Sequence, residues 1–325
     1  LPTNLTFRSD IARDYNAQKL RNIADESFLV IEPTYFKSFT WNRTYNVKYP
    51  ITKALQVDFN AVNQSRIDEE PGELNTSAKR DSVKKNLMRG GRNTNYQHSI
   101  NASYTLPLSK IPILNWVSSS ATYASTYSWV AAPLVRDSLN PDKLTQNPFG
   151  NIIQNSGTIN LSGQGNLIQL YNKVPYLKKV NQKKPGSRKD DKKPKKKPRP
   201  GEKKDSTEKK ETQFDLILQQ TAKVLMMLKN VSVSYTETNG TMLPGYINTS
   251  KGIGRDWGSK TPTLGFVLGS QKDIRSLMVE RGAMTQSTTF NNAYTQTLTQ
   301  NLTWNATLEP VSGFRIAISA NRNYS

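Results

Sequence analysis

The residues of this chain that could do chemistry are few and widely separated. His98 is the only histidine in the 325 residues, so a Ser-His-Asp triad would depend on it. A frequent setting for the nucleophilic serine is a sharp G-x-S-x-G turn. No such turn lies near His98, which stands between Gln97 and Ser99. We therefore interpret His98 as a structural residue, and we expect no catalytic residues and no enzyme activity.

Adjacent carboxylates and glycine pairs are the other candidate sites. Asp68, Glu69 and Glu70 could supply the acid and base of a glycosidase, but a Pro-Gly pair follows them, so we expect a solvated loop. The glycine pairs at 163–165 and 252–254 lack the Lys-Ser/Thr of a phosphate-binding loop. Inside a strand expected over 157–170, glycine instead permits a bend or a close backbone approach.

Cysteine is absent from the chain. This excludes disulfides and cysteine-ligated metals. No metal and no cofactor are expected.

An alternation of apolar and polar residues with a period of two runs through the chain. It is clearest where Leu298, Leu302, Trp304, Ala306 and Leu308 alternate with Thr299, Asn301, Thr303, Asn305 and Thr307. Successive side chains point to opposite faces of a strand, so this pattern predicts a strand with one apolar and one wet face. Only 35% of the residues are hydrophobic, and the mean hydropathy is -0.66. A membrane barrel needs only one apolar face on each strand, so we predict an all-β, antiparallel transmembrane β-barrel.

The connections between the expected strands differ in length in a regular way. Short turns alternate with long polar stretches, which is the layout of an outer-membrane barrel with short periplasmic turns. We count about nine strands, the first broken near residues 9–10, and an odd number does not close a bacterial barrel. The chain also starts without Met and ends inside a strand pattern, so we expect a segment of a larger barrel. The short turns are at 50–53, 109–113 and 309–313, and the long stretches are at 68–95, 131–156 and 240–290.

Three parts follow from this organisation. Barrel strands occupy 1–171 and 229–325, and a Lys/Pro-rich insertion at 172–228 separates them on the periplasmic side. Three- and four-residue spacing of apolar residues predicts a helix over 213–228, with Thr212 as its possible cap.

The positive charge of the chain is concentrated in the insertion. Residues 178–211 hold sixteen Lys and Arg against six Asp and Glu, a surplus of 10 and so half of the net charge of +20. A nucleic-acid-binding arm would interleave aromatic residues for base stacking, and the basic run at 192–200 has none. We therefore expect a disordered linker with weak electrostatic contacts and no nucleic-acid partner.

Aromatic residues lie on or beside the expected strands. Amphipathic rings prefer the two membrane–water interfaces, so these residues are expected to form girdles facing the lipid bilayer. The alternative is that aromatic residues simply have a high strand propensity. The girdle candidates are Trp41, Tyr45, Tyr49, Trp116, Tyr127, Trp129 and Trp304.

Three sequence strings in the second half carry a family resemblance. They are Lys-Asn-Val-Ser-Val-Ser-Tyr at 229–235, Leu-Pro-Gly-Tyr at 243–246 and Pro-Thr-Leu-Gly-Phe-Val-Leu-Gly-Ser-Gln at 262–271. With weaker motifs at 39–43 and 115–117, the chain resembles the SprA-type translocon of the type IX secretion system. The resemblance covers most of the chain, strongly over a minority of it, and the lysine-rich stretch matches only as a variable insertion.

The resemblance implies a location and a function. Such proteins are very large single-chain barrels in the outer membrane of Gram-negative, Bacteroidetes-type bacteria. They export folded cargo proteins to the cell surface, including gliding adhesins in some species. The resemblance further implies a plug protein at the periplasmic mouth and a PorV-type partner barrel at a lateral opening.

The loop expected over 240–290 is the candidate gate. Its apolar residues need a place to be buried, so we expect it to fold inward over the polar, lumen-lining face or to cap the extracellular side. The candidate loop and gate residues are Trp257, Gly265, Phe266, Leu268, Gly269 and Gln271.

Two other functions share some of these features. A TonB-dependent receptor or a porin has the same strand pattern but moves small solutes, and the receptor also has a plug domain. A soluble basic binding protein would have to bury the apolar strand faces inside. Dependence of the purified chain on detergent separates the last possibility from any barrel.

Overall fold

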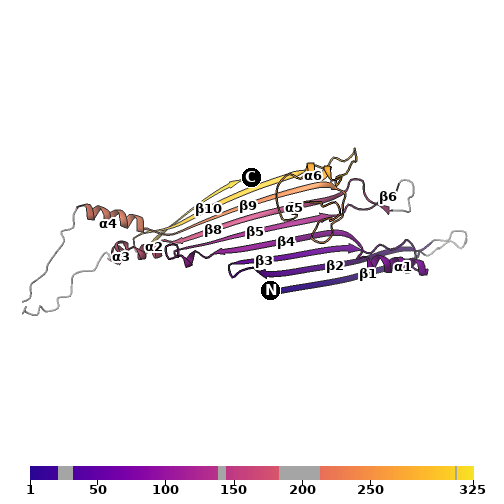
Figure 1. Ribbon diagram of the computed structural model, residues 1–325, viewed down its shortest axis with the longest axis horizontal. Coiled ribbons are helices and arrows are strands. Elements are labelled where there is room, and N and C mark those ends of the chain that lie inside the picture. Colours follow the sequence, from indigo (N-terminus) through magenta and orange to yellow (C-terminus); the bar gives the residue numbers. More distant parts are fainter. Residues whose placement is uncertain (21–31, 138–143, 183–212, 312) are drawn as a thin grey trace, which may run out of the picture.

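A single antiparallel sheet of nine strands dominates the structure (Figure 1). The computed structural model describes residues 1–20, 32–137, 144–182, 213–311 and 313–325. Within these residues, each strand of the sheet pairs with the neighbours that precede and follow it in the sheet order. The expected all-β class and the expected nine strands are confirmed. The strands are β1 (Asn4–Gln18), β2 (Thr34–Pro50), β3 (Leu55–Arg66), β4 (Arg92–Leu106), β5 (Val117–Val130), β8 (Asn151–Asn166), β9 (Leu228–Tyr246), β10 (Thr295–Val311) and β11 (Phe314–Tyr324).

The remaining elements are short. A separate two-stranded sheet pairs β6 (Val135–Arg136) with β7 (Leu144–Thr145). None of the described helices is long and apolar enough to cross a membrane. The helices are α1 (Ser77–Met88), η1 (Leu108–Lys110), α2 (Leu167–Lys173), α3 (Pro175–Gln182), α4 (Gln213–Met226), α5 (Leu264–Val267) and α6 (Arg275–Glu280).

The register of the strands divides the sheet into an apolar face and a polar face. Adjacent rows of paired residues show the difference because neighbouring positions on a strand point to opposite sides. One row runs Leu55, Tyr104, Ala121, Leu161, Tyr235 and Leu302 from β3 to β10 and ends at Arg322 on β11. The next row, on the other face, runs Gln56, Ser103, Thr122, Asn160, Thr236, Asn301 and Asn323 from β3 to β11.

The sheet is open in the described part of the chain. β1 pairs only with β2, and β11 pairs only with β10, so these two strands form the edges. Every residue of β1 and of β11 is exposed. Each edge strand therefore presents a row of backbone N–H and C=O groups that no described strand pairs.

The first strand is continuous, so the break expected near residues 9–10 is wrong. β1 pairs with β2 residue by residue from Asn4 to Gln18. The neighbouring strand supplies backbone partners along this whole length, and a polar pair of positions does not interrupt them. Ser9 adds a side-chain contact between β1 and β2, because its hydroxyl accepts a hydrogen bond from Trp41 Nε1 at 2.8 Å.

Connections of unequal length alternate between the two ends of the sheet, as expected. The connections at 51–54, 107–116 and 312–313 are short and leave from one end, and those at 67–91, 131–150 and 247–294 leave from the other. Three strands extend further into the long stretches than expected, since β4 starts at Arg92, β8 starts at Asn151 and β9 ends at Tyr246. There the apolar face carries polar residues and glycine, so the alternation weakens while the backbone pairing continues.

The segment between β8 and β9 leaves from the short-turn end of the sheet (Figure 1). α4 ends at Met226, two residues before the predicted helix end, while the predicted cap Thr212 and the basic run 192–200 lie outside the described residues. Leu167, expected in the preceding strand, starts α2 instead because the Asn166 side chain accepts a hydrogen bond from Gln169 N and caps the helix.

Candidate functional site

The long loop (residues 247–294) lies against the apolar face of the sheet, at the end from which the long connections leave (Figure 1). It contains α5 and α6 and covers the ends of β3, β4, β5, β8 and β9. A hydrophobic core fills the space between the loop and the sheet. The core residues are Ala61, Tyr96, Tyr127, Trp129, Ile153, Leu243 and Tyr246 from the sheet, and Phe266, Val267, Ile274, Met278 and Ala283 from the loop.

This position corrects the expectation that the loop folds inward over the polar face. The sheet residues that the loop covers all belong to the apolar face by register, for example His98 paired with Tyr127 and Tyr127 paired with Asn155. The physical reason is the burial of apolar side chains, which is also why a buried loop was expected. Its apolar side chains need apolar partners, and only the apolar face offers them.

Phe266 is the centre of the contact. Its ring meets Tyr127 edge-on, with centroids 6.1 Å apart and planes at 84°. Thr263 caps α5 by accepting a hydrogen bond from Phe266 N at 3.2 Å. The cap turns Phe266 and Val267 toward the sheet, where both are fully buried. An edge-on aromatic pair of this kind adds about 0.5–1.5 kcal/mol beyond the burial of its area.

His98 is part of this contact and not of a catalytic triad. It is buried among Phe59, Tyr96 and Tyr127. Its Nε2 lies 3.0 Å from the carbonyl oxygen of Val267. A neutral imidazole donating from Nε2 to this carbonyl ties β4 to the loop backbone. The side chain that could have been chemical is thus used to hold the loop.

Polar groups on β8 and β9 hold the next turn of the loop. Asn155 Nδ2 donates to the carbonyl oxygens of Phe266, at 2.7 Å, and of Ser270, at 3.0 Å. Gln271 Nε2 donates to Asn155 Oδ1 at 3.2 Å, and Thr241 Oγ1 donates to Gln271 Oε1 at 2.5 Å. These bonds satisfy buried carbonyl groups of the loop that would otherwise lose their hydration.

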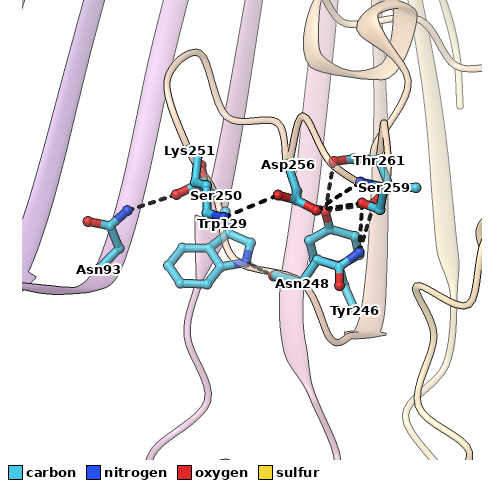
Figure 2. A network of polar contacts seen from close by, with 9 residues as sticks. All are labelled: Asn93, Trp129, Tyr246, Asn248, Ser250, Lys251, Asp256, Ser259 and Thr261. Carbon is cyan, nitrogen blue, oxygen red and sulfur yellow. Dashed lines mark hydrogen bonds and ion pairs between the residues drawn. The ribbon is translucent and has the colours of Figure 1, made fainter.

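A second polar network anchors the start of the loop (Figure 2). Trp129 Nε1 donates to the carbonyl oxygen of Asn248 at 3.0 Å, and Asn93 Nδ2 donates to that of Ser250 at 2.7 Å. Tyr246 OH donates to the carbonyl oxygen of Thr261 at 2.8 Å. The network therefore joins β4, β5 and β9 to the loop backbone.

Asp256 is the acidic residue of this second network. Its carboxylate accepts hydrogen bonds from the hydroxyl and the backbone N–H of Ser259, at 2.7 and 3.1 Å. Burial raises the pKa of Asp256, but the bonds from Ser259 and the charge of Lys251, whose Nζ lies 3.5 Å away, outweigh it. The net effect is a pKa below the usual range, so the carboxylate is ionised at neutral pH.

The loop candidates from the sequence fall into two groups. Gly265, Phe266, Leu268, Gly269 and Gln271 come together over β5 and β8; Leu268 contributes its carbonyl oxygen to a hydrogen bond from Tyr123 OH, while its side chain is exposed. Trp257 stands apart on the outer surface of the loop, 55% exposed.

The girdle candidates also divide. Trp41, Tyr45, Tyr49 and Trp304 lie on the apolar face by register and remain candidates. Trp116 precedes β5 and covers Gly165. Tyr127 and Trp129 are buried beneath the loop, at 0% and 1% exposure, so the girdle interpretation is wrong for these two.

The acidic cluster at 68–70 lies in a loop between β3 and α1, as expected, but only part of it is solvated: Glu70 is exposed, whereas the Glu69 side chain is buried. Arg92 donates two hydrogen bonds to the carboxylate of Asp68, at 2.8 and 3.0 Å. Glu69 bonds to Arg13 Nε at 2.7 Å, lies 4.0 Å from Lys37 Nζ, and has a side chain only 3% exposed. Asp68 and Glu69 are thus paired with basic side chains, and Lys37 Nζ donates to the backbone carbonyl of Glu70. No group of His, Cys, Asp or Glu suited to a metal ion occurs in the ranges that the structure covers.

Sequence reasoning missed the anchors Asn93, Asn155 and Thr241, although a signal for two of them was present. Asn155 and Thr241 occupy apolar-face positions, next to Ile153 and Leu243 on the same side of their strands. A polar side chain on an otherwise apolar face needs a hydrogen-bond partner, which indicates that another part of the protein covers this position and that lipid does not.

Comparison with known proteins assigns no family to this site. No family model matches the chain, and no curated protein matches it either. The function must therefore be argued from the two faces of the sheet and from the long loop.

Proposed function

We propose that this chain is an arc of the wall of a large outer-membrane β-barrel that conducts folded proteins to the cell surface, as the type IX translocon does. The supporting observation is an apolar face that remains exposed beyond the long loop. Leu161, Leu302 and Trp304 are 47%, 40% and 38% exposed there, and all lie on one side of the sheet. A lipid bilayer is the environment in which such a face is stable.

The unpaired edges support a larger barrel. β1 and β11 have 15 and 11 residues and expose their backbone groups along their full length. Long unprotected edge strands promote aggregation, and closure of a barrel removes them. Further strands next to β1 and β11 would complete the wall, and the diameter of a barrel grows with the number of its strands.

The polar face suits the passage of proteins of varied charge. The row of Gln56, Ser103, Thr122, Asn160, Thr236, Asn301 and Asn323 contains no charged residue, and elsewhere on this face charges of opposite sign are neighbours, as Lys48 and Asp58 or Arg8 and Asp10 are. Neutral amide and hydroxyl groups hold water without attracting one sign of charge. A wide lumen lined in this way would let a folded cargo protein pass without strong electrostatic binding.

The orientation follows from the connections. Bacterial barrels place short turns in the periplasm and long loops outside the cell, so the insertion between β8 and β9 would lie in the periplasm and the long loop on the extracellular side. A plug protein and a PorV-type barrel are the partners that the family resemblance implies. The basic insertion offers acidic partners an electrostatic contact.

Site-directed labelling tests this proposal in a full-length protein from which any cysteine outside this chain has been removed; the chain itself contains none. A Thr303→Cys variant places a thiol on the polar face, and a Leu302→Cys variant places one on the apolar face. In the full-length protein in outer membranes, a water-soluble maleimide should modify the first and spare the second. Equal labelling of both would refute the wall.

Cargo separates the translocon from a porin or a TonB-dependent receptor. A photo-crosslinking maleimide on the Thr303→Cys variant should capture a folded secreted protein during export in a translocon. Capture of no protein, together with faster uptake of small solutes in cells that produce the protein, would favour the receptor or porin.

A further inference from the structure

Two cationic side chains of the long loop meet at the backbone carbonyl of a third cationic residue. Arg255 Nη2 donates to the carbonyl oxygen of Lys260 at 2.9 Å, and Arg281 Nη1 donates to the same oxygen at 2.7 Å. The Lys260 side chain itself is exposed. None of the ion pairs among the described residues includes any of the three. This cation cluster (Arg255, Lys260 and Arg281) therefore holds two guanidinium groups at the backbone of a third, exposed cationic residue.

The cluster stands on a turn that the protein holds in place. Backbone hydrogen bonds join Asp256 and Thr261 in both directions, at 2.8 and 3.2 Å. Side-chain bonds among Asn248, Asp256, Ser259 and Thr261 brace the turn from below (Figure 2). Lys260 has a φ of 55°, a left-handed conformation that non-glycine residues adopt only where the surroundings impose it. The two guanidinium groups are thus positioned before any ligand arrives.

The protein leaves hydrogen-bonding capacity of Arg255 unused. Only the bond to the carbonyl oxygen of Lys260 uses its Nη groups, whereas its Nε is buried without a partner and is closed to a ligand from outside. The guanidinium carbon lies 5.5 Å from the centre of the Trp257 ring. An arginine beside an aromatic ring, with donors to spare and no acidic partner, has the chemistry of an oxyanion site.

Apolar side chains close to the cluster in sequence are exposed. Ile253, Trp257 and Val279 are all exposed. The loop also lies on the apolar face, at the end of the exposed band that we assign to lipid. Trp with Lys and Arg on one surface is typical of a membrane–water interface, whereas the cores of protein–protein interfaces are depleted of lysine.

We propose that the cation cluster binds the phosphate of an outer-leaflet lipid headgroup, with Trp257 and Val279 against the start of its acyl chains. The inference rests on the proposed function, because it needs the apolar face to be in a bilayer. The cluster would then set the depth of the long loop in the outer leaflet.

The experiment measures the lipid that the full-length protein retains in nanodiscs of phosphatidylcholine doped with phosphatidylglycerol. Native mass spectrometry gives the apparent affinity for the anionic lipid. Each positive charge near the surface contributes about fivefold to the affinity for an anionic lipid. The affinity should therefore fall roughly 25-fold in the Arg255→Gln/Arg281→Gln variant and about fivefold in Lys260→Gln. Lys260→Gln removes a charge but keeps every hydrogen bond of the turn, so a loss of affinity in this variant cannot be explained by misfolding. Arg275→Gln on α6, whose charge Asp273 already pairs at 2.8 Å, is the control and should lose nothing.

Two results would overturn the inference. One is an unchanged lipid affinity in Lys260→Gln and in the double variant. The other is full displacement of the lipid by millimolar inorganic phosphate, which would mean that the cluster recognises phosphate without its tails. If either result is found while Thr303→Cys is labelled and Leu302→Cys is not, only the lipid site is refuted and the proposed barrel remains. If the two variants are labelled equally, the proposed barrel itself is refuted.

Discussion

Gly157 of β8 and Gly269 of the long loop touch backbone to backbone. A Cβ on Gly157 would lie 2.8 Å from the carbonyl oxygen of Gly269, and Gly269 has a φ of +94°. A close backbone approach was expected at Gly163 and Gly165, but it occurs at Gly157: nothing lies within 4 Å of a Cβ on Gly163, and the atom nearest to a Cβ on Gly165 belongs to the Trp116 side chain. Because both partners of the Gly157 contact are backbone, neither can turn aside as a side chain can. This contact makes the loop position sensitive to a single methyl group.

Gly157→Ala should loosen the long loop. The added methyl group meets the Gly269 carbonyl, and overpacking of this kind costs about 1–3 kcal/mol. Proteolysis of residues 247–294 in the folded protein should become faster. Gly163→Ala is the matched control, since it lies on the same face of the same strand with nothing within 4 Å of its Cβ. Equal cleavage rates in the two variants would contradict the close contact.

Asn155→Ala should release the turn after α5. It removes the donors to the carbonyl oxygens of Phe266 and Ser270, and an unsatisfied buried group costs about 1–3 kcal/mol. Hydrogen exchange of amides in 264–271 should accelerate by the corresponding factor. Asn160→Ala, on the polar face of the same strand, removes a side chain whose Oδ1 has no partner, so exchange in the loop should stay as it is. Unaltered exchange in both variants would show that Asn155 does not hold the turn.

Asp256 should make the start of the loop sensitive to acid. Its pKa is lower in the folded protein than in the unfolded chain, where about 3.9 is usual. Its contribution to stability is therefore complete above about pH 4 and is lost as the pH falls through the folded value. Amide exchange at Thr261 should accelerate in that acidic window.

The variant Asp256→Asn should lose this acid response and show faster exchange at neutral pH. Asp273→Asn, which is outside the network, provides the comparison and should keep the response. A wild-type amide at Thr261 equally protected on both sides of the window would count against the role of Asp256.

Tyr171→Phe should free the helices at the short-turn end. Tyr171 is buried, and its hydroxyl donates to the carbonyl oxygens of Leu225 and Leu228 at 2.8 and 3.0 Å. Loss of these bonds should cost about 1 kcal/mol and increase proteolysis at the end of α4. Tyr176→Phe in α3 changes an exposed hydroxyl and should have no effect. The same sensitivity in both variants would rule out the tie between α2 and β9.

Alternation in the sequence was enough to predict the sheet. Leu302 and Trp304 face one way, and Asn301 and Thr303 face the other, because a strand has a strict period of two. The lengths of the connections then indicated which ends of the strands lie together. These features are local, so they can be read without knowing what packs where.

The site was harder to predict because it depends on contacts across long separations. The string at 262–271 was identified as a candidate, but its partners His98, Asn155 and Thr241 come from three different strands. Tyr127 and Trp129 had the alternation expected of a lipid-facing girdle. Nothing in their local sequence says that a loop more than a hundred residues away covers them.

The sequence by itself determined the nine strands, their two faces and the alternation of short and long connections, since backbone geometry converts a period of two directly into a face. Only the tertiary structure decided that the long loop lies on the apolar face, that His98 and Asn155 hold it there, and that Arg255 and Arg281 meet at Lys260. Those outcomes depend on which apolar surface is free to be buried and on which buried carbonyls need donors. These outcomes depend on contacts between residues far apart in the chain, so local sequence patterns contain little information about them.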